Sequence, residues 1–145
     1  MSFLKIFLLL FVINLKSQSE ISVQKFKLEI EVQNIKNDGD MYFALYDNDE
    51  NFNSPNESTE LMLLAIKEKV FVNNHRMNIF LAKGNYAIKI YIDKNYNEKF
   101  DFNFFGFPKE QYGFSNNATG ILGPPDFKAS SFQVKNDSII NIKMK

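Results

Sequence analysis

The stretch QKFKLEIEV, residues 24–32, decides the fold class of this chain. Its apolar side chains, Phe26, Leu28, Ile30 and Val32, alternate strictly with charged ones. Successive side chains of a β-strand point to opposite faces of the sheet, so the alternation predicts a strand with one buried and one solvated face. Such a strand needs a second sheet packed over its apolar face.

Similar short patterns follow along the chain, separated by turn residues. We predict strands at residues 41–46, 77–81, 86–92, 131–134 and 138–144. Residues 37–40 (NDGD) are predicted as a hairpin turn that pairs the first two strands, and residues 136–137 (ND) as the turn of a last hairpin. Residues 60–72 leave two options: a short helix over residues 61–66 capped by Ser58 or Thr59, or a strand that ends at residues 70–72. Short strands with a turn about every ten residues favour an antiparallel sandwich.

The N-terminus has the pattern of an export signal. Residues 6–13 (IFLLLFVI) form an apolar run that follows Lys5 and precedes a polar stretch with Ser17 and Ser19. This order predicts a signal peptide over residues 1–19, cleaved near Ser17 to Ser19, and a single domain over residues 20–145 exported to the periplasm or outside the cell. A membrane-spanning helix needs roughly 20 apolar residues, so we do not expect an integral membrane protein. The alternative is a first core strand, which would lack turn residues at its end.

The composition argues against several functional classes. The chain has 17 basic and 17 acidic residues, a formal net charge of zero, and no basic stripe for phosphates, so we expect no nucleic acid partner. The absence of cysteine removes thiol catalysis and thiolate metal sites. The chain has one histidine, His75, and no strained serine elbow motif with which it could form a catalytic triad. We expect no enzymatic activity, with a glycoside hydrolase that uses a carboxylate pair as the remote alternative.

Residues 93–127 break the strand pattern and hold seven of the chain's ten glycines and prolines. The motifs GNYAI (84–88), DKNYNEKFD (93–101), FGFPKE (105–110), YGFSNN (112–117) and GPPDF (123–127) resemble a family of bacterial secreted proteins known as domain of unknown function 2141. The resemblance covers nearly the whole mature chain and implies a periplasmic or extracellular immunoglobulin-like domain without an established activity. Glu98 departs from the family, which often has glycine there. The expected fold is all-β: an antiparallel immunoglobulin-like or transthyretin-like β-sandwich of about seven strands with one long ordered loop.

One constellation in this segment has the pattern of a metal site. Asp93, Asn95, Asn97 and Asp101 stand at spacings at which loop oxygens converge on Ca²⁺, with the carbonyl of Lys99 as a fifth ligand. Two features count against it, because Glu98 stands where such loops need glycine and Phe104 where a bidentate glutamate should close the site. A carboxylate from elsewhere would have to complete the shell, and the candidates are Asp47, Asp49, Glu110 and Asp126. The alternative is a hydrogen-bonded turn rich in Asn and Asp without a metal.

The same segment gathers aromatic side chains, namely Phe102, Phe104, Phe105, Phe107, Tyr112 and Phe114. We expect them to cap the open end of the sandwich, because phenylalanine in folded domains is mostly interior. The alternative is an exposed platform for a sugar, peptide or lipid surface. The residues predicted to contact a ligand or partner are Phe105, Phe107, Glu110, Tyr112, Asn116 and Asn117.

Two functions from different classes remain. The first is an exported, non-catalytic binding module that uses residues 93–127, with an envelope protein or a glycan as partner and Ca²⁺ as a possible organiser. The second is a structural or adhesion-type envelope domain with no small ligand. A concave, partly exposed aromatic floor beside polar groups would favour the binding module, and a fully buried aromatic cluster would favour the structural role.

Overall fold

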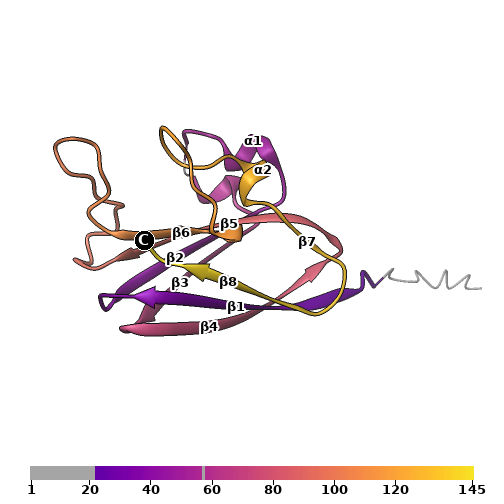
Figure 1. Cartoon of the computed structure of the whole chain (residues 1–145). Coiled ribbons are helices and arrows are strands. Elements are labelled where there is room, and N and C mark those ends of the chain that lie inside the picture. Colours follow the sequence, from indigo (N-terminus) through magenta and orange to yellow (C-terminus); the bar gives the residue numbers. More distant parts are fainter. Residues whose placement is uncertain (1–21, 57) are drawn as a thin grey trace, which may run out of the picture.

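The computed structural model describes residues 22–56 and 58–145, and the predicted signal peptide lies outside the described residues. These residues form eight strands in two packed sheets (Figure 1), so the all-β sandwich is confirmed. The strands are β1 (Lys25–Ile35), β2 (Gly39–Tyr46), β3 (Leu64–Val70), β4 (Asn73–Ala82), β5 (Gly84–Asp93), β6 (Gln111–Phe114), β7 (Phe132–Val134) and β8 (Ser138–Lys143). The short helices are α1 (Asp49–Phe52), η1 (Thr59–Leu61), η2 (Ser115–Asn117) and α2 (Phe127–Ser130).

The core lies between the two sheets and is built from the predicted alternation. In β1, Leu28, Ile30 and Val32 are buried, while the charged residues between them lie on the outer face. In β2 the buried set includes Met41 and Phe43. One sheet has the order β4-β1-β8 and the other β3-β2-β5-β6, with β7 paired to β5.

The predicted hairpin at residues 37–40 is wrong, because β1 and β2 belong to different sheets. β1 pairs with β4 and β8, whereas β2 pairs with β3 and β5, so the turn carries the chain across the core. A bulge between Val32 and Ile35, with Asn34 at φ 64°, bends the end of β1. Gly39 is needed for close packing rather than for a positive φ, since a Cβ there would lie 2.5 Å from the carbonyl oxygen of Asp93.

The predicted C-terminal hairpin is wrong for the same reason. β7 pairs with β5 in one sheet, and β8 pairs with β1 in the other. The β1–β8 pair is also parallel, which departs from the expected all-antiparallel arrangement. Residues 60–72 follow the strand option, since β3 covers Leu64–Val70. The predicted helix over residues 61–66 is wrong, because the turn that Ser58 caps, η1, ends at Leu61.

The segment 93–127 is not one loop. β6 pairs with β5 and is followed by η2, so the segment divides into two loops, residues 94–110 and 118–126. Both loops extend beyond the five-stranded sheet on the side away from the three-stranded sheet (Figure 1). In residues 22–56 and 58–145, no helix has the length and apolar character needed to cross a membrane.

Candidate functional site

The outer face of the five-stranded sheet carries an aromatic groove that the sequence analysis missed. Tyr42 of β2 and Tyr91 of β5 face each other in register, and their rings stack with centroids 4.7 Å apart. They line a groove of about 370 Å³ together with the side chains of Lys67 and Lys89. The signal was present in the sequence, because both tyrosines occupy outward positions of strands whose inward positions are apolar. No residue of the segment 93–127 lines this groove, so it does not test the expectation of a concave aromatic floor formed by that segment.

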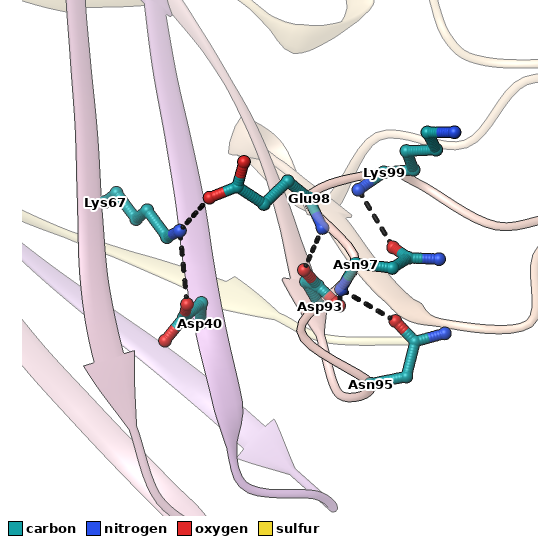
Figure 2. A network of polar contacts seen from close by, with 7 residues as sticks. All are labelled: Asp40, Lys67, Asp93, Asn95, Asn97, Glu98 and Lys99. Atoms are coloured by element: carbon teal, nitrogen blue, oxygen red, sulfur yellow. Dashed lines mark hydrogen bonds and ion pairs between the residues drawn. The ribbon is translucent and has the colours of Figure 1, made fainter.

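The Asp/Asn-rich turn after β5 is closed by its own hydrogen bonds (Figure 2). Asp93 is fully buried, and its carboxylate accepts hydrogen bonds from the backbone N–H groups of Asn97 (3.3 Å) and Glu98 (2.7 Å). Asn95 Oδ1 accepts from the N–H of Asn97, and Asn97 Oδ1 accepts from the N–H of Lys99. The structure therefore brings together the side chains that the spacing predicted, as linked Asx turns.

Asp101 joins this turn through its carboxylate. Asn95 Nδ2 and Asn97 Nδ2 both donate to Asp101 Oδ2, at 2.7 and 2.9 Å. Amide nitrogens thus occupy the position where a cation would require ligand oxygens. Over the described ranges, no three acidic or histidine side chains converge as a metal site would require. In this arrangement the donor set fits the hydrogen-bonded turn, and a cation would need both amides to turn over.

Glu98 holds an unusual backbone conformation for a residue with a side chain. Its φ is 63°, in the left-handed region that glycine occupies at this position of calcium loops. Its carboxylate pairs with Lys67 Nζ at 2.9 Å, and Lys67 also pairs with Asp40 at 3.3 Å (Figure 2). The adjacent Tyr42 side chain, whose ring centroid lies 5.0 Å from Lys67 Nζ, and the hydrogen bond to Glu98 raise the pKa of the Lys67 ammonium group. These contacts tie the turn to β3 and β2.

Glu110 is buried and comes directly before β6. Its Oε1 accepts from the N–H of Lys94 at 3.1 Å and its Oε2 from the N–H of Asp101 at 3.2 Å. Burial raises the pKa of Glu110, and the charges of Asp93 and Asp101 raise it further, although the two N–H groups lower it. Glu110 therefore acts as an internal clamp between both ends of the turn.

Residues 101–109 form a projecting hairpin with its own hydrogen bonds. The N–H of Lys109 donates to the carbonyl of Asp101 at 2.8 Å, and the N–H of Asn103 donates to the carbonyl of Phe107 at 2.8 Å. Asn103 Oδ1 accepts from the N–H groups of Phe105 and Phe107, and Gly106 takes a φ of 81° at the tip. The tip is thus held in one conformation by local bonds.

The aromatic side chains of this segment divide into two groups. Phe100, Tyr112 and Phe114 pack onto the outer face of the sheet, in ring contacts that continue to Tyr91 and Phe52. The hairpin residues are exposed: Phe104 to 97%, Phe105 to 81%, Phe107 to 67% and Phe102 to 53%. The expected aromatic cap is therefore wrong for Phe104, Phe105 and Phe107, whereas Phe102 keeps a ring contact with Phe100, with centroids 4.9 Å apart.

The remaining predicted contact residues lie apart from the hairpin tip. Tyr112 is half-buried on the sheet beside Phe100. Asn116 Nδ2 donates to the carbonyls of Ala129 and Ser131, and Asn117 Oδ1 accepts from the N–H of Lys143 at 2.7 Å. Both asparagine amides hold neighbouring segments in place, and their contact with a partner stays a prediction.

A second exposed apolar tip is present in the loop 118–126. Ile121 is exposed to 99% and Leu122 to 100%. The loop closes tightly, because a Cβ on Gly120 would lie 2.1 Å from the carbonyl oxygen of Gly123. The sequence analysis included this loop in the segment 93–127 but did not single out these two side chains.

The comparison with known families agrees with the resemblance seen in the motifs. The family model described as an uncharacterized protein conserved in bacteria (DUF2141) matches residues 30–141. This chain therefore belongs to the DUF2141 family. No curated protein and no solved structure matches it.

Proposed function

We propose that this chain is an exported, non-catalytic binding module whose contact surface is the hairpin of residues 101–109. The observation that carries the proposal is the exposure of four phenylalanine side chains on an ordered, projecting element. Export rests on the apolar run of residues 6–13 and the small polar residues that follow it.

The sandwich has a complete core without the hairpin, which weakens a purely structural role for it. The main buried cluster is formed by β1 to β5, β7, β8 and flanking residues such as Met144, and it contains no residue of the segment 101–109. A contiguous apolar surface left in water is costly to solubility, and such surfaces commonly mark interaction sites. Ring contacts from Phe102 through Phe100 to Tyr91 connect the hairpin with the aromatic groove, which extends the surface on which a partner can rest.

The test compares where the chain resides in cells that produce it. We expect the native chain in the envelope fraction and a Phe104→Ser/Phe105→Ser variant shifted to the soluble fraction. Phe80→Ser is the matched control, because Phe80 is also exposed, to 62%, but lies on β4 in the other sheet. Attachment through any other segment is the same in all three chains. Equal distribution of the three chains would contradict the proposal.

The second part of the proposal is that Ca²⁺ organises the turn below the hairpin. Asp93 and Asp101 belong to this turn and Glu110 to its base, although the three carboxylates do not converge as a ready metal cluster, and none of them forms an ion pair with another described residue. Burial is the main cause of the raised pKa of Glu110, the charges of Asp93 and Asp101 raise it further, and a cation would offset this repulsion. Asp93, Asp101, the side-chain oxygens of Asn95 and Asn97 after rotation, and the Lys99 carbonyl would hold it.

Calcium titration tests this part separately from the hairpin. Ligand that binds only the folded state stabilises it by about 2.7 kcal/mol at a hundredfold excess over Kd, so the melting temperature should rise in millimolar Ca²⁺. An Asp93→Ala/Asp101→Ala variant should show no rise, and Mg²⁺ serves as the control cation. An unchanged melting temperature of the native chain removes calcium from the proposal and leaves the hairpin surface intact.

A further inference from the structure

Two apolar tips lie on one side of the molecule, although they come from separate loops. Phe104 and Phe105 form the end of the first loop, and Ile121 and Leu122 the end of the second. β6 and η2 separate these loops in the chain. Figure 1 shows both loops rising from the five-stranded sheet in the same direction, away from the three-stranded sheet.

We infer that the partner of this surface is a lipid bilayer, into which both tips insert at the level of the headgroups. This inference rests on the proposed function and names the class of its partner. Each tip is convex and projects from the sheet, so a protein partner would need two separate pockets at matching positions. A bilayer accepts both tips at once without any preformed shape.

The chemistry of the tips fits the interfacial region of a membrane. Phenylalanine and leucine are among the side chains that interfacial segments bury about 5–10 Å into the boundary between headgroups and acyl chains. Hydrogen bonds that Asn103 Oδ1 accepts, together with those within the hairpin backbone, already fix the first tip, so insertion does not require its backbone to become ordered.

The charges around the hairpin fit anionic headgroups. Lys99 and Lys109 are exposed at its base, and their long side chains can extend to lipid phosphates while the rings insert, whereas Lys94 Nζ donates to the carbonyl of Lys109 at 3.0 Å. The exposed acidic group nearby is already engaged, because Glu98 pairs with Lys67. The carboxylate of Asp101 accepts hydrogen bonds from two asparagine amides.

Fluorescence of single tryptophans tests the inference in the whole chain, which contains no natural tryptophan. Phe104→Trp and Ile121→Trp place a reporter on each tip, and Phe80→Trp places one on the opposite sheet. Each chain is mixed with vesicles of phosphatidylethanolamine and phosphatidylglycerol that carry bromine near the top of the acyl chains. We expect a shift to shorter wavelength and quenching for the two tip reporters and neither for Phe80→Trp. Another membrane-binding segment would hold the chain near vesicles without inserting the tips.

A partition measurement adds the expected magnitude. The Phe104→Ser/Phe105→Ser variant removes both hairpin rings. Each ring that is lost should lower the vesicle partition coefficient about tenfold, the change that corresponds to 1.4 kcal/mol. Lys99→Gln/Lys109→Gln should weaken partitioning into these vesicles but not into vesicles of phosphatidylcholine alone, because only the former carry a negative surface.

Three results would overturn the inference. They are unchanged emission of Phe104→Trp, unchanged emission of Ile121→Trp, and equal quenching of Phe80→Trp. If the tips fail to insert while the Phe104→Ser/Phe105→Ser variant still leaves the envelope fraction, the partner is a protein or a glycan and only the lipid inference fails. If the variant also stays in the envelope fraction, the proposed function itself fails.

Discussion

Replacing Phe104 and Phe105 by serine should leave the sandwich almost as stable as before. Burying a whole phenylalanine side chain contributes about 1.5–3 kcal/mol. Phe104 is 97% exposed and Phe105 81%, so folding buries only a small part of each ring. Scaling by the buried part, and allowing for their edge-to-face contact, the double substitution should lower the free energy of unfolding by less than about 1 kcal/mol.

Thermal unfolding followed by circular dichroism measures this, with Phe52→Ala as the control. Phe52 is 1% exposed and packs edge-on against Tyr46 and Phe127, so its loss should cost about 3–5 kcal/mol. At roughly 4 °C per kcal/mol, the control should melt more than 10 °C early and the hairpin variant within about 4 °C of the native chain. A hairpin variant that melts as early as the control would show that these rings belong to the core, and the binding surface would be refuted.

Three further predictions concern the backbone and the buried carboxylate. Gly39→Ala should lower the free energy of unfolding by about 1–3 kcal/mol, because the new Cβ would overlap the carbonyl of Asp93. Urea titration measures this, and an unchanged midpoint would show that β2 and β5 separate easily. The Glu98→Gly variant should be more stable than Glu98→Ala by about 1 kcal/mol, since the left-handed conformation at this position favours glycine. At most positions the alanine variant is the more stable one, and that order here would mean that the turn relaxes. The pKa of Glu110 is raised, so above its ordinary value of 4.5 the folded chain holds a proton that the unfolded chain has released, and the free energy of unfolding falls as pH rises through this window. Glu110→Gln should flatten that slope, and an identical slope in both chains would count against a raised pKa.

The faces of the strands could be predicted from the sequence, but their partners could not. The alternation in residues 24–32 identifies Leu28, Ile30 and Val32 as inward, and all three are buried. The same pattern suits a strand that pairs with its neighbour in the chain and a strand that faces it across the core, because both bury the same side chains. The pairing of strands could therefore be predicted only from the turn residues, and the two hairpins predicted from them are wrong.

The links in this fold follow an order that local turn rules do not describe. The short links after β1, β3, β4 and β7 each carry the chain from one sheet to the other. The antiparallel pairs formed by neighbours in the chain, β2–β3 and β5–β6, are joined by the long segments 47–63 and 94–110. A short turn between sheets needs close backbone approach, as at Gly39, whereas a hairpin turn needs a positive φ. Glycine serves both, so its presence does not separate them.

At the candidate site, side-chain spacing was informative and exposure was not. The spacing of Asp93, Asn95, Asn97 and Asp101 correctly predicted a turn that gathers their side chains. Nothing in the composition of residues 102–107 distinguishes buried rings from exposed ones, because the outcome depends on where the hairpin points. Asn103 fixes the shape of the tip by accepting two hydrogen bonds from its backbone, and a single asparagine in an asparagine-rich chain is a weak signal.

The carboxylates and the exposed rings nevertheless form one mechanical unit. Asp93 ends β5, and Glu110 comes directly before β6, so the paired strands of the five-stranded sheet deliver both acids to the base of the hairpin. Glu110 binds the N–H groups of Lys94 and Asp101, and the carbonyl of Asp101 accepts the first cross-strand bond of the hairpin. Any change in charge at this base, by a proton or by a cation, must therefore act on the hydrogen bonds that aim the tip. The acids that resemble metal ligands and the rings of the proposed contact surface are coupled through only a few bonds, so calcium binding and hairpin contacts should be measured on the same set of variants.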